Sequence, residues 1–300
     1  MNLKKVLLIK ISLFNNLSVL IFFLSSLISA TDNKEKSYFD CPCPQILAHQ
    51  GSSKELPPNT IEAYQLALDQ GADIIELDVW RAKDGTWVVI HDKNLLRITG
   101  VNKDVTKLRY DEIRLLDAGY SFTDSNGNHL YRNKGYKIPS LEEVFKKFNN
   151  KKINIEIKGN SKTGLRDLSD LIKKYKMDKM ILVVSFSYNV IKKFRKITEH
   201  KIATAASRSD IKRMIYFKRF PGYEYNFKAF QLPFYSRIVK KYGMINKNWI
   251  EKMQANDLVI HYWTIDNSED VEEAIAIGAN GIITNTPKTV FNVLERLGKR

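Results

Sequence analysis

The sequence is poor in cysteine and in acidic residues. Two cysteines, Cys41 and Cys43, stand on either side of Pro42 in a chain of 300 residues. They are too few for a scaffold built from disulfide bonds or for a structural zinc site. Asp and Glu number 33 against 48 Lys and Arg, so the formal net charge is +15. Such an excess is typical of proteins that meet nucleic acid, an anionic membrane surface or an acidic small substrate.

The chain also lacks internal repeats, a low-complexity linker and a glycine-rich dinucleotide turn after its first predicted strand. Without that turn the sequence does not favour a doubly wound open sheet. Without a linker it gives no reason to divide the chain into two folded domains. With 44% hydrophobic and 27% charged residues, the composition excludes wholesale disorder.

The clearest long apolar run lies near the N-terminus. The first ten residues contain three lysines and no acid. The apolar run Leu17–Leu27 follows them, and the small residues Ser29-Ala30 come after it. This order is typical of a secretory signal. Residues 1–30 are therefore predicted to be a signal peptide or, if uncut, an N-terminal anchor. The rest of the protein, beginning with a lead-in segment over residues 31–44, is predicted to be exported, either periplasmic or extracellular.

From residue 45 onward, short β-branched runs alternate with amphipathic stretches. Eight such strand–helix units in about 250 residues predict a single α/β domain over residues 45–300, a TIM-type (β/α)8 barrel. The predicted barrel strands are Gln45–His49, Asp73–Val79, Ile153–Lys158, Met180–Ser185, Ile202–Ala206, Ala229–Leu232, Val259–Thr264 and Gly281–Thr284. The predicted helices are Thr60–Gln70, Ser140–Phe148, Leu165–Tyr175, Asn189–Glu199, Lys247–Ala255, Ser268–Ile277 and Pro287–Leu297.

One interruption follows the second predicted strand. Asp84-Gly85 lies between two strand-like runs and predicts a hairpin that returns through Trp87–His91. Residues 92–139 then form a long polar stretch. Segments of that length in a compact domain are usually functional or carry small elements of their own, so a small insertion after the second strand is predicted.

Acidic residues recur with a period of two in the second and third barrel strands. In Asp73–Val79 this period places Glu76 and Asp78 on one face, and in the next strand it places Glu156 and Lys158 on one face. The opposite faces are Ile, Leu and Val, which suit packing against helices. The acids therefore point into the barrel near the carboxyl ends of the strands, where barrel enzymes have their active sites.

Three carboxylates so close together would repel one another and raise each other's pKa. A bound divalent cation removes this conflict, and an all-oxygen ligand set favours Mg²⁺ or Ca²⁺. Glu76, Asp78 and Glu156 are therefore predicted to form a metal site. The alternative is a structural network in which the acids pair with Lys158 or Arg81.

Two of the five histidines fall at the ends of strands beside these acids. His49 ends the first strand and His91 ends the hairpin strand. Because a histidine can accept or donate a proton near neutral pH, the two are predicted to act as an acid and base pair. His261 shares a strand face with Trp263 and is predicted to line the barrel as a pocket wall.

A series of motifs runs through residues 46–287 in a fixed order. They are His49-Gln50-Gly51, Pro57-Pro58-Asn59-Thr60, Gly71 to Val79, Lys83-Asp84-Gly85, His91-Asp92 with Arg97, Ile138 to Glu143, Asn154 to Lys158, Ser185-Phe186, Trp263 to Asp266 and Gly278 to Thr284. The ordered set resembles the glycerophosphodiester phosphodiesterase family, which has a single barrel with a small insertion after the second strand.

The resemblance implies hydrolysis of glycerophosphodiesters to glycerol 3-phosphate and an alcohol. It implies one divalent cation, Ca²⁺ or Mg²⁺, which together with Lys158 would offset charge on the phosphoryl oxygens. The residues it assigns are Glu76, Asp78 and Glu156 to the metal, His49 and His91 to acid–base catalysis, Lys158 to the phosphate and Trp263 to the glycerol side of the substrate.

Two positions depart from the family pattern. Gln50 stands where the family usually has an arginine that binds the phosphate, and glutamine can donate a hydrogen bond but carries no charge. Pro58 stands where the family usually has glutamate. Two alternatives therefore remain: an exported binding protein for phosphodiesters or anionic lipid with weak activity, and a lysophospholipase D or phospholipase D-type lyase on the same barrel.

Residues 211–240 combine seven basic residues, one acid and nine Phe or Tyr. Such a mixture suits contact with lipid headgroups, and this stretch is predicted to guide lipid-derived diesters from a membrane surface to the site. The alternative is a helix with an aromatic core face and solvated lysines. No nucleic acid partner is expected, because an exported protein rarely meets one.

Overall fold

The computed structural model describes residues 37–40, 44–217 and 225–300. Its strands are β1 (Gln45–His49), β2 (Ile74–Arg81), β3 (Trp87–Val89), β4 (Lys152–Ile157), β5 (Ile181–Val184), β6 (Ala203–Thr204), β7 (Ala229–Pro233), β8 (Val259–Trp263) and β9 (Gly281–Thr284). Its helices are α2 (Ile61–Asp69), α3 (Leu96–Thr99), the 3-10 turn η1 (Val105–Lys107), α4 (Tyr110–Ile113), α5 (Leu141–Lys147), α6 (Leu165–Lys174), α7 (Tyr188–Ile197), α8 (Arg208–Phe217), α9 (Arg237–Lys241), α10 (Lys247–Gln254), α11 (Ser268–Ala276) and α12 (Pro287–Arg296).

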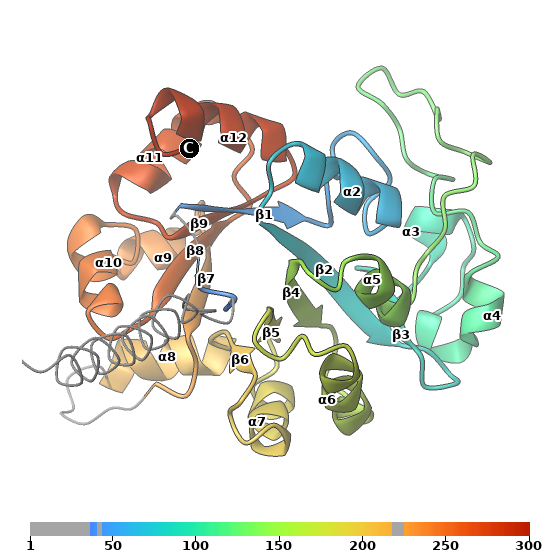
Figure 1. Cartoon of the computed structure of the whole chain (residues 1–300), viewed down its shortest axis with the longest axis horizontal. Helices are drawn as coiled ribbons and strands as arrows, with labels where there is room; N and C mark the ends of the chain where they lie inside the picture. The colour runs from blue at the N-terminus through green and yellow to red at the C-terminus, as the bar shows by residue number, and fades with distance from the viewer. Residues whose placement is uncertain (1–36, 41–43, 218–224) are drawn as a thin grey trace, which may run out of the picture. The chain divides into compact units, whose positions relative to one another are not determined.

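The parallel strands form the barrel that the sequence predicts, with the helices around them (Figure 1). The strand order is β6-β5-β4-β2-β1-β9-β8-β7, and an isolated parallel bridge between Ala205 and Ala229 joins the two ends of this sheet. Strand β3 lies outside the ring and pairs antiparallel with β2. The predicted TIM-type fold class is therefore confirmed.

All eight predicted barrel strands are present, but four helices were not among the predicted ones. The short helices α3 and α4 lie in the insertion. Helices α8 and α9 each lie partly within residues 211–240, the basic and aromatic stretch for which a helix was the alternative interpretation. Helix α9 spans only five residues, too few for a 3.6-residue period to stand out from its surroundings. Its start is nevertheless fixed locally, because Ser236 Oγ accepts a hydrogen bond from Val239 N.

The two faces of the barrel strands separate as predicted. Ile75, Leu77 and Ile155 pack outward in one buried cluster with helices α5, α6 and α7. Leu47 and Ile74 belong to a second cluster, which fills the barrel interior with side chains from β5, β7 and β9. The barrel interior is therefore a packed core, and an open cavity lies toward the carboxyl ends of the strands.

The lead-in segment takes part in this interior. Tyr38 is buried and packs with the inner cluster. Its backbone N donates to Lys179 O at 2.7 Å, and its hydroxyl lies 3.4 Å from Asn154 Oδ1. Asn154 Oδ1 also accepts from Gln231 Nε2 at 2.8 Å. The packed barrel thus begins before residue 45, the boundary that the strand pattern predicts.

His261 is buried inside the barrel beside Gln231 and does not line the open cavity. This corrects its predicted place as a pocket wall. Its Nδ1 lies 3.3 Å from Gln231 Nε2, which can only donate. The Nε2 atom, which then carries the proton, has no hydrogen-bond partner among the described residues. Burial lowers the pKa of His261 to about 3, so the ring stays neutral in the folded protein.

This neutral histidine is expected to weaken the fold in mild acid. Below pH 6.5 the unfolded chain binds a proton at this position and the folded chain does not, so stability is lost as pH falls from 6.5 toward 3. At pH 5 the loss from this residue is about 2 kcal/mol. Urea unfolding from pH 7 to pH 5 should show a shallower pH dependence in His261→Gln. An exposed control, His200→Gln, should follow the wild-type curve, and parallel curves for wild type and His261→Gln would contradict the expectation.

The insertion packs around a small core of its own. Leu95, Ile98, Val105 and Ile113 from α3, η1, α4 and their connections are buried together with Val88 of the hairpin. Tyr110 N, at the start of α4, donates to Asp84 Oδ2 in the hairpin turn at 2.9 Å. The insertion is thereby fixed to the end of β2 and β3, beside His91.

Within the described residues, no helix has both the length and the hydropathy needed to cross a membrane. The predicted signal peptide or anchor at residues 1–30 lies outside those residues, as does most of the lead-in segment. Residues 218–224 of the basic aromatic stretch are also outside them.

Candidate active site

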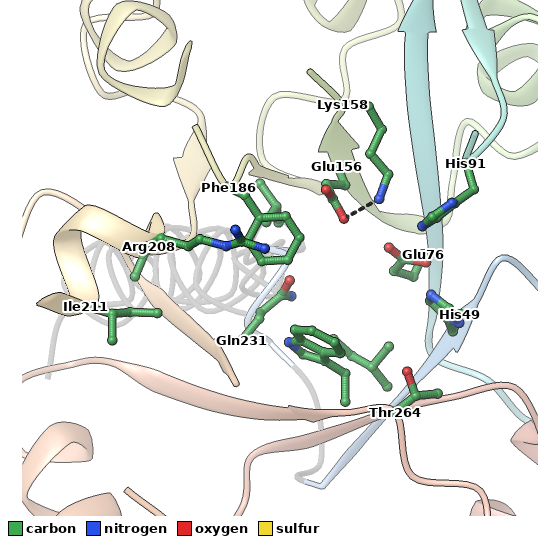
Figure 2. A pocket seen from close by; sticks show the side chains of 14 residues that line it. His49, Glu76, His91, Glu156, Lys158, Phe186, Arg208, Ile211, Gln231 and Thr264 are labelled. Atoms are coloured by element: carbon green, nitrogen blue, oxygen red, sulfur yellow. Dashed lines mark ion pairs between the residues drawn. The ribbon is translucent and has the colours of Figure 1, made fainter. Parts of the chain in front are cut away.

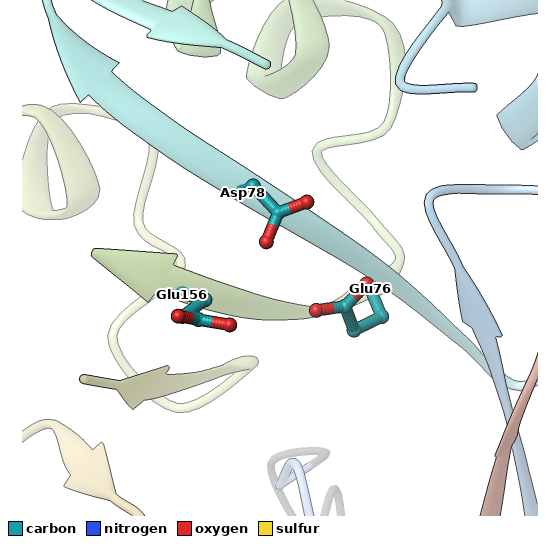
Figure 3. Close-up of side chains that lie close together, drawn as sticks. All are labelled: Glu76, Asp78 and Glu156. Atoms are coloured by element: carbon teal, nitrogen blue, oxygen red, sulfur yellow. The ribbon is translucent and has the colours of Figure 1, made fainter. Parts of the chain in front are cut away.

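The strand register brings three carboxylates together. In the pairing of β2 with β4, Asp78 stands opposite Glu156, and in the pairing of β1 with β2, His49 stands opposite Glu76. One oxygen from each of Glu76, Asp78 and Glu156 lies within 4.8 Å of the other two (Figure 3). Two adjacent parallel strands therefore direct the predicted acids to one point.

Burial and mutual repulsion disfavour the charged forms of these acids. Burial, followed by the charges of Asp78 and Glu156, raises the pKa of Glu76 well above its ordinary value. Burial also raises the pKa of Glu156, and the charge of Asp78 adds to it against the lowering effect of Lys158. The cluster is thus short of positive charge.

The two oxygens of Asp78 have different surroundings. Oδ2 accepts hydrogen bonds from Gln50 Nε2 at 2.9 Å and Asn59 Nδ2 at 3.3 Å. Oδ1 receives no aligned hydrogen bond from the described residues, although Lys158 Nζ lies 3.0 Å away as an ion pair. A buried carboxylate oxygen with no aligned hydrogen bond fits a cation ligand, so the donor set fits a divalent ion that prefers oxygen.

Lys158 lies between two of the acids. Its Nζ is 3.0 Å from Asp78 Oδ1 and 3.0 Å from Glu156 Oε2. Burial lowers the pKa of Lys158, but the two carboxylates outweigh it and the net pKa is raised, so the side chain is a cation. Arg81, the other partner considered for a structural network, pairs with Asp167 instead.

Gln50 is held against the carboxylates. The residue lies in the left-handed region with φ 58°, and its backbone N donates to Glu76 Oε2 at 3.1 Å. The next residue, Gly51, has φ 87°, and a Cβ there would lie 2.6 Å from the backbone of Ala63, so only glycine fits. Because the Gln50 amide contacts Asp78 and not the open cavity, its contact with substrate stays a prediction.

Two residues that follow β8 and β9 hold His49. Asn285 Nδ2 donates to Asp266 Oδ2 at 2.7 Å, so the amide oxygen of Asn285 faces His49. That oxygen lies 2.7 Å from His49 Nδ1 and accepts a hydrogen bond from it. In the neutral ring the Nε2 atom is then left with its lone pair, the form that a general base needs.

His91 has a different kind of partner. Its Nδ1 lies 2.7 Å from Asp92 Oδ1, and the other oxygen of Asp92 pairs with Arg97. Although burial opposes it, hydrogen bonds from Arg97 and His91 lower the pKa of Asp92, which keeps the carboxylate ionised. A ring that faces an ionised carboxylate is suited to carry a second proton, which a general acid must do.

Both histidines and two of the acids, Glu76 and Glu156, line one cavity of about 280 Å³ (Figure 2). Lys158 and Trp263 line it too, so of the predicted site residues Gln50 and Asp78 alone lie behind its surface. The wall away from the carboxylates is mostly apolar and also carries one cation, Arg208. Its apolar side chains are Val184, Phe186, Ala206, Ile211, Trp263 and Ile283, and Gln231 and Thr264 are its polar ones.

The roles of Asn285, Asp266 and Arg208 were not predicted from the sequence. Asp266 and Asn285 each come within a few residues of the carboxyl end of a predicted strand, the same signal that identifies the acids. Arg208 likewise stands two residues after the predicted strand Ile202–Ala206. Strand-end position was therefore a usable signal for all three residues.

Comparison with known proteins gives consistent results. The model of the Glycerophosphoryl diester phosphodiesterase family matches residues 49–289. A "Glycerophosphodiester phosphodiesterase" of Caldanaerobacter subterraneus is 33% identical over 259 residues, covering 84% of this chain and 98% of the relative. A human lysophospholipase D is 26% identical over 271 residues, covering 84% of this chain and 85% of the relative.

Solved structures share the fold. A phosphodiesterase from Oleispira antarctica, determined in complex with the product sn-glycerol-3-phosphate, superposes with a TM-score of 0.66 at 21% identity. The match covers 84% of this chain and 97% of that one. The barrel fold of this chain is thus one that solved structures share.

Proposed function

The chain belongs to the glycerophosphoryl diester phosphodiesterase family, and from this premise we propose that it is a metal-dependent phosphoric diester hydrolase. It cleaves glycerophosphodiesters to glycerol 3-phosphate and an alcohol. The observation that carries the proposal is the single cavity lined by His49, His91, Glu76, Glu156 and Lys158. An acid–base pair, a carboxylate cluster and a cation are the groups that hydrolysis of an anionic diester requires.

The acids and Lys158 have different roles in this reaction. Glu76, Asp78 and Glu156 would hold one divalent cation, which when bound offsets charge on the phosphoryl oxygens. Ca²⁺ and Mg²⁺ both suit an all-oxygen ligand set. Lys158, already a cation beside the cluster, attracts the diester and holds a phosphoryl oxygen.

The hydrogen-bond partners of the histidines support an order of proton transfers. His49 Nε2, whose lone pair is set by the contact of Nδ1 with Asn285, accepts the proton of the attacking hydroxyl, either water or a neighbouring glycerol hydroxyl. His91, whose Nδ1 faces Asp92, donates a proton to the departing alcohol oxygen. Asn285 and Asp266 act as positioning residues for the base, and Asp92 and Arg97 for the acid.

An exported location belongs to the same proposal. The basic n-region and the apolar run within residues 1–30 support a periplasmic or extracellular enzyme, released by cleavage or held by an N-terminal anchor. Fusion of residues 1–36 to a reporter that is active only after export would test this location.

A second candidate is lysophospholipase D activity, which one observation favours. The wall of the cavity away from the carboxylates is largely apolar and could contact an acylated glycerol. Contact of the basic aromatic stretch over residues 211–240 with a membrane surface would bring such substrates to the site. A weakly active binding protein is the third candidate, motivated by Gln50.

One assay separates these candidates. The purified protein should release glycerol 3-phosphate from glycerophosphocholine in the presence of Ca²⁺ or Mg²⁺ and lose this activity in a chelator. Lysophosphatidylcholine as the better substrate would favour the second candidate, and a cyclic phosphate product would identify a lyase. Diester binding without turnover at any cation concentration would contradict both enzymatic candidates and leave the binding protein.

A further inference from the structure

One cation on the cavity wall has no role in the proposed chemistry. Arg208 is the first residue of α8 and lines the same cavity as the two histidines. Figure 2 places its guanidinium beside Phe186, across the cavity from His49 and His91. Its role is therefore to be sought in recognition of the part of the substrate that lies on this wall.

Hydrogen bonds among buried side chains fix the backbone on both sides of Arg208. Ser207 Oγ donates to Asp210 Oδ2 at 2.9 Å, and Asp210 N donates back to Ser207 Oγ at 3.2 Å. Arg195 Nη1 donates to the same carboxylate at 3.2 Å. Because Ser207, Asp210 and Arg195 are all buried, the start of α8 holds a constant position at the rim of the cavity.

The side chain of Arg208 is positioned but not neutralised. Its Cζ lies 4.6 Å from the centre of the Phe186 ring, and Phe186 in turn meets Trp263 edge to face at 6.1 Å. Arg208 makes no ion pair with any described residue. Stacking on a ring occupies the face of a guanidinium and leaves its N–H edge able to bind an anion with two hydrogen bonds.

The charges in the cavity are separated. The acids lie on β2 and β4 and Lys158 directly follows β4, whereas Arg208 begins α8 and lines the cavity together with Ala206, Ile211 and Phe186. Arg208 is exposed, so an anion that enters the cavity can reach its guanidinium directly. The cavity of about 280 Å³ is at the small end for ligand sites, which run from about 300 Å³, and so suits a compact polar group.

We infer that Arg208 binds a second acidic group of the substrate, joined through a short linker to the phosphodiester that is cleaved. This inference rests on the proposed hydrolase function and narrows its substrate class to glycerophosphodiesters with an additional phosphomonoester on one of their alcohol groups. The stacked guanidinium provides the specificity, and the histidines and the cation site provide the cleavage.

The test compares two substrates that differ by one phosphomonoester. They are glycerophosphoglycerol and glycerophosphoglycerol phosphate, assayed with the full protein at the same Ca²⁺ or Mg²⁺ concentration. Wild type should favour the second substrate in kcat/KM by about 10- to 100-fold, the range for a charge-assisted contact. Arg208→Gln should bring this ratio close to one. Arg208→Lys should keep part of the preference, because an ammonium lacks the planar fork.

A matched control lies on the same helix. Arg213 also stacks on an aromatic ring, that of Tyr188 at 4.2 Å, but does not line this cavity. Arg213→Gln makes the same charge change and should leave the ratio at its wild-type value. The products add a second readout of which glycerol leaves. Two molecules of glycerol phosphate mean that the phosphorylated glycerol departs, whereas glycerol with glycerol bisphosphate means that it stays on the phosphoryl group.

Each outcome decides a different point. The ratio does not depend on the fraction of folded enzyme, so an unchanged ratio in Arg208→Gln overturns the inference. Equal losses on both substrates would assign the guanidinium to the scissile phosphate instead. If wild type cleaves neither substrate but binds them, the proposed hydrolase function fails, whereas cleavage without preference overturns only the inference about Arg208.

Discussion

Replacing His91 with alanine is expected to lower kcat/KM for glycerophosphocholine by about 10²–10⁴-fold, the usual effect of removing a general acid. The same variant is expected to lose much less on the p-nitrophenyl ester of glycerol phosphate, because a phenolate departs without first being protonated. The reason lies in the partner of the ring. His91 Nδ1 faces the ionised Asp92 at 2.7 Å, which stabilises the proton that the other ring nitrogen donates.

His49→Ala is expected to show the opposite dependence on the leaving group. A base that activates the nucleophile is needed whatever alcohol departs, so the loss should be similar on both esters and in the same range. His49 Nδ1 faces the neutral amide of Asn285, which suits a ring that begins without the second proton. Both variants should be compared with His200→Ala, whose imidazole is exposed. Equal losses for His91→Ala on the two esters would contradict the assignment of the acid.

The alternation of residues in β2 and β4 is sufficient to predict the carboxylate cluster. Inside a barrel, a period of two decides which side chains face inward, and Glu76, Asp78 and Glu156 follow that period without exception. Neighbouring parallel strands end at the same edge, so the acids meet without any loop needing to be placed. The same logic correctly places His49 beside Glu76.

Residues on loops depend on geometry that strand periodicity does not contain. Gln50 points at Asp78 because its backbone takes φ 58°, a local turn that the motif alone does not specify. Asn285 reaches His49 across 236 positions of the chain, and Arg208 meets Phe186 only because β5 and β6 are neighbours. Such contacts form only when the strands close into a barrel and bring distant parts of the chain together. The sequence therefore predicts the reacting groups of the site better than the residues that select its substrate.

Replacing Glu156 with glutamine is expected to impair cation binding without destabilising the fold. In wild type, a saturating divalent cation should stabilise the protein by about 2.7 kcal/mol at 100 times its Kd, which raises Tm by roughly 5–10 °C for a domain of this size. In Glu156→Gln this rise should be mostly lost, and kcat/KM should fall by about 10³-fold, since several kcal/mol of charge stabilisation depend on the bound ion.

Without added cation, the same substitution is expected to leave Tm unchanged or to raise it. Burial and the neighbouring acids disfavour the charge on Glu156 and on Glu76, so a neutral amide relieves repulsion that the ion would otherwise offset. Glu199→Gln provides the matched control, because Glu199 is exposed and pairs with Lys201 on the surface, away from the cavity. If cation raised the Tm of Glu156→Gln as much as that of wild type, the ion would bind elsewhere and the carboxylates would be the structural network around Lys158.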